Sequence, residues 1–467
     1  MSTNGTDFQS VTSPITIIQG NASNSVIIVE DNVNSDSAVL QTGFYNRTAI
    51  IQFGNDKISI LRQPGLFNRA MIIQVASTEQ AVQTLDALQG EGPDATNFLF
   101  KMQTSINDSH PIAQQFGNLS LDQAGTVAQN FIFAPEVSRV NVGLLEDISL
   151  HFTSVLENRL DQQRSGFCMD QQPLALGADG AGSAVKRDPV CSSGPFFATL
   201  SYGQADRDSA LGALGYEQRI RSATLGADFR INPMSQWGIA VNFANSDSDI
   251  HQGLGSVDAT SYQIGGFGSF SQSQYYLDLI ATLGTVDFSS NRFSGATRVS
   301  ADTDGWSYTG RLQGGYLFEQ DNLRFGPFLT ARYAKGSVDA YWEKGSPLLT
   351  QGIDEQDRES FVASLGAAID RQDTLGGYPI RSYLKLELER DFGIGGEDTV
   401  ESRFSFSPDF VVTTPLDDVA KETYGRISGG LSLMLNRQAQ FSLAGMTLVG
   451  ADQVDRYNLY GQLSVAF

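Results

Sequence analysis

The stretch DRYNLYGQLSVAF, Asp455–Phe467, decides the fold. Its residues alternate between a mostly apolar set and a mostly polar set, which is the period of a β-strand with two unlike faces. The apolar set is Tyr457, Leu459, Gly461, Leu463, Val465 and Phe467, and the other is Arg456, Asn458, Tyr460, Gln462, Ser464 and Ala466. A soluble sandwich would turn the apolar face to a core and a membrane barrel would turn it to lipid, so one strand leaves both folds open.

Number and length of the strands favour the barrel. The same alternation recurs from Gly194 onward, as where Leu384, Leu386 and Leu388 alternate with Lys385, Glu387 and Glu389. We count twelve strands, the even number that a bacterial antiparallel barrel requires, and many of their apolar stretches reach the roughly 9–11 residues of a tilted membrane strand. They begin near Pro195, Glu217, Gln236, Thr260, Gln274, Gly305, Leu323, Glu359, Ile380, Glu401, Thr423 and Gln440. We expect interfacial aromatic girdles from residues near strand ends, among them Tyr275, Tyr341, Trp342 and Tyr457.

Composition and charge agree with many strands and turns. The 467 residues include 47 Gly, with 10% aromatic, 41% hydrophobic and 18% charged side chains. The formal charge of −21 repels nucleic acid, so we expect no nucleic-acid partner. The sequence contains no run of about 18 apolar residues, which a helix in contact with lipid would need. The first residues, MSTNGTDFQS, lack the basic and apolar regions of an export signal. We expect that such a signal lies upstream or was trimmed away, and a copy that is not exported is the alternative.

A charged helix is predicted ahead of the strands. Within VGLLEDISLHFTSVLENRLDQ, steps of three and four residues connect Leu145, Ile148, Phe152, Val155 and Arg159, while Glu146, Asp147, Glu157 and Asp161 lie around them. From Val142 to Asp161 such a helix would be about 30 Å long, but its charges exclude lipid. It would lie inside a water-filled pore, with His151 and Arg159 meeting polar or oppositely charged partners on the wall, or pack as an amphipathic helix on a domain. Upstream, STEQAVQTLDAL (77–88) and SLDQAGTVAQNF (120–131) have capping-box spacing and predict two short helices.

The N-terminal segment carries an eleven-residue repeat. Gln or Glu recurs at Gln19, Glu30, Gln41, Gln52, Gln63 and Gln74. Strand alternation between these positions indicates rungs made of two eleven-residue strand-turn halves, in which stacked side-chain amides would form ladders about 4.8 Å apart. The segment resembles the curlin repeat of curli amyloid fibres, whose Gln-x-Gly-x-x-Asn-x-Ala-x-x-x-Gln pattern is met by Gln63, Gly65, Asn68, Ala70 and Gln74, and nearly met by Gln41, Gly43, Asn46, Thr48 and Gln52. A generic β-solenoid or an irregular strand stack is the alternative.

Residues 195–467 resemble the translocator β-domain of type V autotransporters. The resemblance is carried by LGADFRI with Gly226 and Asp228, the strand containing Gly366, and the sequences WGIAVNFANSDSDI, SYQIGGFGSF, YYLDLIATLG and LYGQLSVAF. It implies that Tyr460, Leu463, Val465 and Phe467 are read by the barrel-assembly machinery and that Val142–Asp161 plugs the pore. No asparagine pair matching the family's helix-cleavage motif is visible.

Two cysteines, Cys168 and Cys191, lie 23 positions apart in a polar stretch. A disulfide between them would imply an oxidising compartment, and two free thiols are the alternative. Four zinc ligands are not available there, and we expect no metal and no cofactor. The three histidines, His110, His151 and His251, are scattered and no Gly-x-Ser-x-Gly elbow is present, so we expect no catalytic residues and no enzyme.

We therefore predict a mainly β protein: a curlin-like β-solenoid passenger (1–76), a helical junction (77–141), a pore helix (142–165), a disulfide-closed linker (166–194) and a twelve-stranded antiparallel transmembrane β-barrel (195–467). The expected role is display of the passenger at the surface of a Gram-negative outer membrane, for adhesion or biofilm contact. Expected partners are outer-membrane lipid, the barrel-assembly machinery, a host or matrix surface, and further copies through the repeats. The alternatives are a porin-like channel, in which Lys385, Glu387 and Glu389 on the pore wall would set ion selectivity, and a nucleator of amyloid-like surface fibres.

Overall fold

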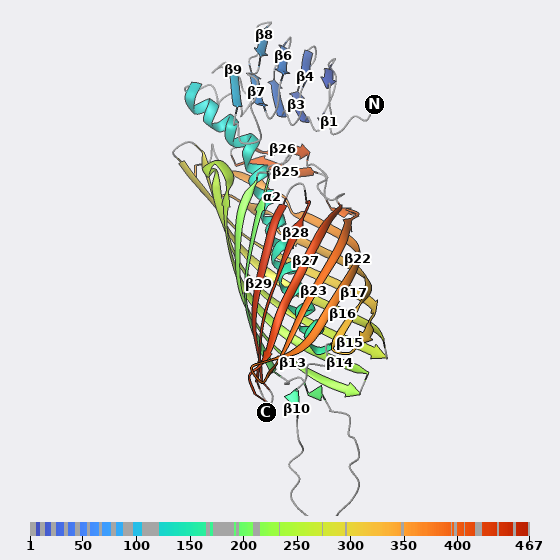
Figure 1. The fold of residues 1–467 in the computed structure, drawn as a ribbon. Helices are drawn as coiled ribbons and strands as arrows, with labels where there is room; N and C mark the ends of the chain where they lie inside the picture. Colours follow the sequence, from blue (N-terminus) through green and yellow to red (C-terminus); the bar gives the residue numbers. More distant parts are fainter. Residues whose placement is uncertain are drawn as a thin grey trace, which may run out of the picture.

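The computed structural model describes residues 6–9, 15–19, 25–31, 36–42, 47–53, 57–64, 68–75, 81–86, 97–104, 121–164, 169–170, 191–192, 196–208, 215–232, 234–272, 274–294, 297–346, 350–393, 395–396, 399–405, 407–415, 423–436, 439–451 and 454–465. The side chains that it describes all lie at residue 137 or beyond. Three parts follow one another along the chain: N-terminal strands, one long helix and a barrel (Figure 1).

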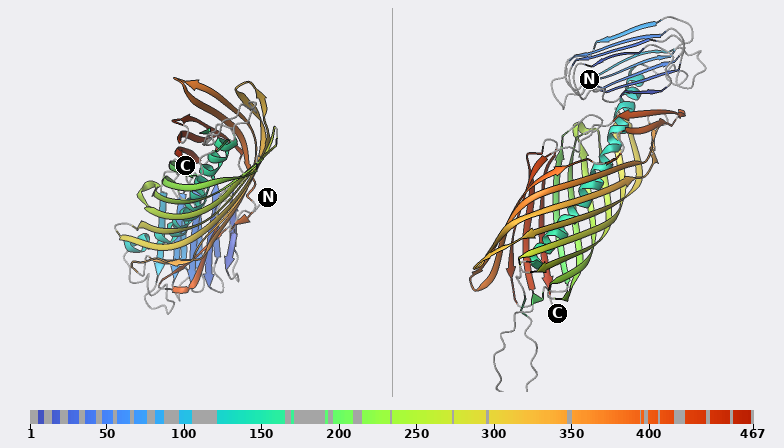
Figure 2. Two further views of the ribbon diagram at one scale, coloured as in Figure 1. Left: turned by 90° about the horizontal axis from the view of Figure 1, so that it is seen from below. Right: turned by 90° about the vertical axis from the view of Figure 1, so that its right-hand side faces the viewer.

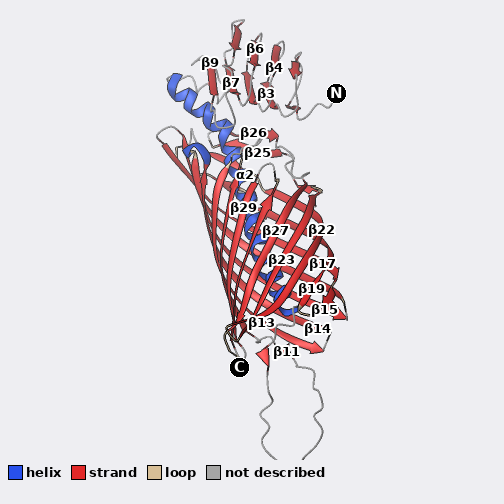
Figure 3. Cartoon of the chain, viewed as in Figure 1, coloured by secondary structure: helices blue, strands red, loops and turns tan. Residues whose placement is uncertain are grey.

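The C-terminal part is a closed barrel of twelve antiparallel strands (Figure 3). Each strand pairs with its neighbours, and pairing of β19 with β22 and of β12 with β29 completes the circle. The strands are β12 (Phe196–Arg207), β13 (Tyr216–Asn232), β14 (Ser235–Ile250), β15 (Gly255–Gln272), β16 (Tyr275–Ser294), β17 (Thr297–Tyr316), β19 (Leu323–Val338), β22 (Gln356–Leu375), β23 (Tyr378–Asp391), β27 (Thr423–Met434), β28 (Ala439–Val449) and β29 (Val454–Val465). The prediction of a twelve-stranded barrel is confirmed, and the sandwich alternative is wrong.

One predicted barrel strand is misplaced. The strand expected near Glu401 is β25 (Thr399–Phe404), which pairs with β21 and β26 outside the barrel. Its six residues are too short to cross a bilayer as a tilted strand. The twelfth barrel strand is instead the terminal β29, whose alternation is the clearest in the sequence.

The barrel wall is apolar outside and polar inside. In β29, Leu459 and Leu463 are 52% and 45% exposed, whereas Tyr460 and Gln462 are 3% and 1% exposed. The same inversion places Lys385 and Arg426 inside and leucines outside on neighbouring strands. An apolar exterior of this kind matches a lipid-facing barrel.

Exposed rings lie near both ends of the outer surface. Tyr275 packs on Tyr316 with ring centroids 4.9 Å apart, and Tyr457 packs near Tyr202 at 6.5 Å. Tyr341 does not belong to such a girdle, because its ring is buried in a small sheet beyond the barrel strands, and Trp342 lies in the same small sheet. Aromatic character alone could not separate a ring at the lipid surface from one in a loop core.

A single helix, α2 (Leu121–Arg164), runs through the barrel (Figure 2). It joins the helix predicted at 120–131 to the predicted pore helix. The other helix predicted upstream, at 77–88, is wrong: β8 (Ala81–Asp86) pairs in parallel with β6, and this ladder overrides the local capping signal. In the part of the chain that the structure describes, no helix combines the length and apolar character needed to cross a bilayer.

Alternate N-terminal strands form two parallel sheets. One contains β1 (Thr6–Gln9), β3 (Ser25–Asp31), β5 (Arg47–Phe53), β7 (Asn68–Val75) and β9 (Asn97–Thr104), and the other contains β2 (Ile15–Gln19), β4 (Asp36–Thr42), β6 (Lys57–Pro64) and β8. Gln41 is the Cα partner of Gln63, and Gln52 is the Cα partner of Gln74, so the backbone pairing follows the 22-residue spacing of two repeats.

Two long connections of the barrel build a further sheet, which we call the mouth sheet. It consists of β20 (Tyr341–Trp342), β21 (Gln351–Ile353), β25 and β26 (Ser407–Pro415), and it lies at the end of the barrel that faces the N-terminal sheets (Figure 1). At the opposite end, hairpins such as β13–β14 and β15–β16 are joined by two residues each. The remaining elements are β10 (Met169–Asp170), β11 (Cys191–Ser192), β18 (Phe318–Gln320), β24 (Gly395–Gly396) and the 3-10 helix η1 (His251–Gly253).

Candidate functional site

The candidate site is the contact between α2 and the inner wall of the barrel. From Val137 to Gln162 most helix side chains are buried, although the sequence distributes charges around the whole helix. In the first turns inside the barrel, the apolar side chains of Val142, Leu145 and Ile148 pack with Tyr216 and other wall residues. A cavity between Leu145 and the wall has a volume of only about 20 Å³. The helix and wall side chains fill the space between them here.

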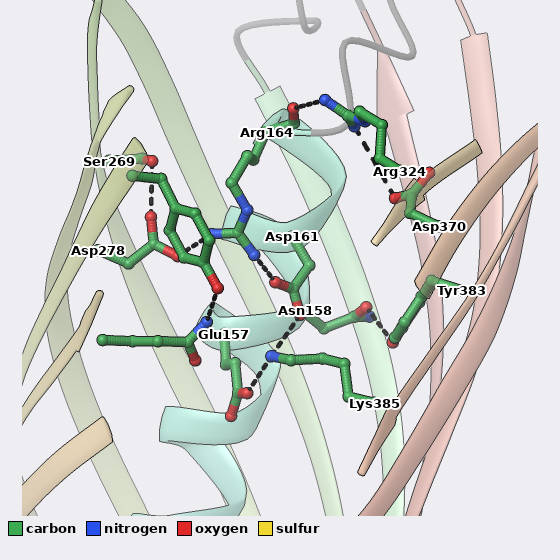
Figure 4. Close-up of polar contacts among 12 residues, drawn as sticks. Glu157, Asn158, Asp161, Arg164, Ser269, Asp278, Arg324, Asp370, Tyr383 and Lys385 are labelled. Atoms are coloured by element: carbon green, nitrogen blue, oxygen red, sulfur yellow. Dashed lines mark hydrogen bonds and ion pairs between the residues drawn. The ribbon is translucent and has the colours of Figure 1, made fainter. Parts of the chain in front are cut away.

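A charged cluster holds the middle of the helix. Glu157 accepts from Lys385 at 2.7 Å, pairs with Arg311 at 2.9 Å and with Arg426 at 3.1 Å. Lys385 also donates to Asp161 at 3.0 Å (Figure 4). The three cations come from β23, β17 and β27, so one helical carboxylate ties three wall strands together.

Wall carboxylates neutralise the cations of this cluster. Arg426 contacts Glu387 at 2.5 Å and Glu389 at 2.8 Å, and Ser364 donates to Glu387 at 3.1 Å. Burying an ion is costly unless it is paired and hydrogen-bonded, and this cluster supplies both kinds of contact. Lys385, Glu387 and Glu389 therefore occupy the pore wall in contact with the helix or with Arg426, not with an open channel.

The helix ends in a second cluster. Arg164 pairs with Asp278 and Asp161, and its guanidinium lies 3.8 Å from the centroid of the Tyr276 ring. Arg324 donates to the backbone carbonyl of Arg164 at 3.0 Å (Figure 4). A helix leaves its last carbonyls without intrahelical donors and favours positive charge at this end, so both arginines stabilise the terminus.

His151 and Arg159 contact another part of the wall. His151 Nε2 lies 2.9 Å from Ser201 Oγ. Arg159 donates to Asp228 at 2.9 and 3.0 Å and to Ser464 at 2.8 Å. A His beside a Ser can serve as base and nucleophile, but this pair is enclosed between helix and wall. Among the described residues, no group of three or more His, Cys, Asp and Glu is placed to hold a metal ion.

The mouth sheet packs where the helix leaves the barrel strands. Arg292 of β16 donates to Glu343 at 2.6 and 2.5 Å, and the backbone N–H of Gln351 donates to the same carboxylate at 2.8 Å. Tyr341 packs with Ala301, Ile353 and Val400 in a small core, and burial raises the pKa of its phenol above the usual range. The long connections are therefore ordered by a small core and by an ion pair with the barrel strand β16.

The other predicted site residues are scattered. On β29, Tyr460 points inward against Val155 and His151, whereas Leu463 points outward. Val465 lies at the end of the same strand, and Phe467 is outside the described residues, so the assembly signal stays a prediction.

For the repeat ladder, the structure describes only the backbone of Gln41, Gln52, Gln63, Asn68, Ala70 and Gln74, and Gly43, Asn46 and Gly65 are outside the described residues. Cys191 lies in β11 and Cys168 is outside the described residues, so the disulfide also stays a prediction.

Sequence reasoning missed several wall partners. Arg311, Asp278 and Arg207 were not predicted as site residues, although each binds a helix charge. Each stands at an inward position of its strand, where a barrel interior admits charge. An ionisable residue at an inward position of a strand's alternating pattern is the signal that could have found them.

Comparison with known proteins gives a family and several relatives. The family model described as "Autotransporter beta-domain" matches residues 196–445. The "Uncharacterized protein in trpE-trpG intergenic region" of Pseudomonas putida is 29% identical over 162 residues, 33% of this chain and 27% of that protein. "Esterase EstA" of Pseudomonas aeruginosa is 26% identical over 205 residues, 42% of this chain and 31% of that protein. The chain thus spans less than a third of the length of these relatives.

Among solved structures, the translocator domain of autotransporter NalP from Neisseria meningitidis is similar. The two share 14% sequence identity with a TM-score of 0.49, and the match covers 69% of this chain and 98% of that chain. The beta domain of the Bordetella autotransporter BrkA matches with 19% identity and a TM-score of 0.44, and the match covers 59% of this chain and 100% of that chain.

Proposed function

The chain belongs to the autotransporter β-domain family, and from this premise we propose that its barrel anchors the segment before α2 at the surface of a Gram-negative cell. Autotransporter barrels are outer-membrane translocators. The observation that carries the proposal is the helix that fills this barrel, ion-paired to the wall along its length, with the N-terminal strands beyond one barrel end.

Loop lengths support the orientation. Bacterial outer-membrane barrels have short periplasmic turns and longer extracellular loops. In this barrel the long connections build the mouth sheet, and the N-terminal sheets lie at the same end (Figure 1). The two-residue turns and the end of α2 at Arg164 lie at the opposite, periplasmic end.

The ion pairs support retention of the segment. A helix that slid outward would pull Glu157, Asp161 and Arg164 away from their counter-ions, and separating buried ion pairs costs several kcal/mol each, roughly 3–5 for removal of one partner. Since no asparagine pair of the family's cleavage motif is visible in the helix sequence, we expect the segment to stay covalently attached.

For the displayed segment we propose adhesion or matrix contact. The parallel 22-residue pairing supports a stack of repeats resembling curlin, which could contact a host or matrix surface or further copies of itself. One relative is named an esterase, but the match spans only 31% of that protein. We propose no catalytic activity for this chain, because its histidines are scattered between the junction, the helix and the barrel end.

Assembly and redox partners complete the proposal. The barrel-assembly machinery would read the terminal strand through Leu463, Val465 and Phe467, with Tyr460 on its inner face. The exterior would contact outer-membrane lipid. Cys168 and Cys191 would form a disulfide in the periplasm, an oxidising compartment.

Protease accessibility on intact cells tests the proposal. The chain, given an export signal, would carry one epitope tag before residue 6 and a control tag within 171–190, between α2 and β12. Protease should remove the first tag while leaving the second, because only the first lies outside the cell. Loss of the first tag only after lysis would defeat the display model, whereas protection of the second tag checks that the membrane is intact.

A further inference from the structure

The barrel closes at a seam that no loop ties together. β12 is the first barrel strand and β29 is the last, and they pair over twelve residues from Phe196 opposite Val465 to Arg207 opposite Val454. Most other neighbouring strands are consecutive and joined by hairpins. The β12–β29 seam therefore depends on its own hydrogen bonds and on side chains that bridge it.

Three helix side chains each contact both strands of the seam. Asp147 pairs with Arg207 of β12 at 3.0 Å and with Arg456 of β29. Near the other end, Arg159 donates to Ser464 of β29 at 2.8 Å, and its guanidinium lies 4.9 Å from the ring centroid of Phe197 of β12.

His151 bridges the middle of the seam. Its ring contacts Ser201 of β12 at 2.9 Å and lies 5.7 Å from the ring of Tyr460 of β29. These three helix positions are four and eight residues apart. Each step of four residues turns about 40° around the helix, so the stripe winds gradually, as contact with tilted barrel strands requires.

Other helix charges pair with strands away from the seam. Asp161 pairs with Lys385 of β23 at 3.0 Å, and Arg164 pairs with Asp278 of β16. Three strands separate β16 from β12, and two strands separate β23 from β29. The helix thus offers two sets of charges, one at the seam and one elsewhere.

We infer that α2 braces the closing seam of the barrel, with Asp147, His151 and Arg159 as the positioning residues that hold β12 against β29. Removing Asp147 leaves Arg207 and Arg456 without their shared carboxylate, and removing Arg159 takes away its contacts with Ser464 and Phe197 on the two sides of the seam. Both changes weaken the seam before any other strand pair. The inference concerns barrel closure and stands whether or not the N-terminal segment is displayed.

Amide hydrogen exchange of the full chain in detergent micelles tests this role. The seam variant is Asp147→Asn with Arg159→Gln, and its matched control is Asp161→Asn with Arg164→Gln, which removes the same two kinds of charge from the same helix. In the seam variant, exchange in β12 and β29 should accelerate about tenfold while β16 and β17 keep the parent rates. In the control, any acceleration should fall in β16 and β23.

Equal acceleration of the seam in both variants, or a uniform rise over all strands, would overturn the inference. Unchanged amide exchange rates in β12 and β29 of the seam variant would also overturn it. If a double variant does not fold, the single variants Arg159→Gln and Arg164→Gln are compared in the same way. The first should open the seam more than the second, and the reverse ranking would refute the brace.

Discussion

At the scale of single residues, the barrel interior is organised by charges that share partners. Glu157 meets three cations and Lys385 meets two helical carboxylates, so no single pair carries the whole cluster. Removing one member still leaves its partners buried with fewer counter-ions. The loss of stability on substitution should therefore depend on how many counter-ions the remaining buried charges keep.

Lys385 gives a direct test of this argument. Lys385→Met removes a buried cation from Glu157 and Asp161 and should lower the free energy of unfolding by about 3–5 kcal/mol. Lys335→Met is the matched control, because Lys335 pairs with Glu359 at 2.8 Å on the outer surface, and it should cost at most about 1 kcal/mol. Denaturant titration in micelles measures both. Equal losses would show that burial of the pair does not matter.

Glycines opposite inward-facing rings form a second residue-scale pattern. Phe328 lies directly opposite Gly366, and a Cβ added at Gly366 would approach its ring to 2.3 Å. Gly226 stands in the same relation to Phe197, at 2.2 Å. These are the two glycines quoted for the family resemblance, and each makes room for a ring that would otherwise meet a side chain.

The substitution Gly366→Ala should therefore lower the free energy of unfolding by about 1–3 kcal/mol, because the Phe328 ring is buried beneath Lys385 and has little room to move. At Gly310, an added Cβ meets nothing within 4 Å, and Gly310→Ala should change stability by less than about 0.5 kcal/mol. The same titration compares the two. A neutral Gly366→Ala would mean that the ring can shift without cost.

At the scale of elements, the sequence predicted what a local period encodes. Two-residue alternation located most barrel strands, and three-to-four-residue spacing located the helix around Phe152. Capping-box spacing failed at Ala81–Asp86, where a parallel strand partner decides the structure. Alternation failed at Thr399–Phe404, because it does not say which sheet a strand joins.

The site was predictable only in part for the same reason. Arg159 and Lys385 could be assigned to a pore, because helical spacing and strand alternation show which face each residue occupies. Their partners could not be assigned, because Asp228 and Glu157 lie 69 and 228 residues away in sequence. Only closure of the sheet brings such positions together.

Conductance tests the helix as an element. The parent chain in a planar bilayer should conduct weakly, since α2 fills the barrel, and deletion of 142–161 should raise the single-channel conductance several-fold. Deletion of residues 1–104, which leaves α2 in place, should not change it. A parent conductance as large as that of the helix deletion would favour the porin-like alternative.

At the scale of the whole molecule, the barrel and the N-terminal sheets obey opposite pairing rules. Barrel strands pair antiparallel with their neighbours, and the circle leaves no free edge. The N-terminal strands pair parallel at long sequence offsets and end in edge strands, such as β2 and β8. Open edges can accept further strands, so fibre growth, if this chain supports it, belongs to the N-terminal sheets alone.

A peptide of residues 15–74 tests that possibility apart from the barrel. Cα partners Gln41 and Gln63 repeat the same residue at one ladder position, so stacked copies would align amides with amides, and the parent peptide should bind thioflavin. Gln41→Lys with Gln63→Lys would oppose two ammonium groups there and should abolish the fluorescence, because like charges directly opposite each other are destabilising. Gln41→Asn with Gln63→Asn keeps the amides and should retain most of it. Absence of thioflavin fluorescence with the parent peptide would rule out the fibre-nucleation hypothesis. It would not bear on surface display, since display depends on the barrel and the helix.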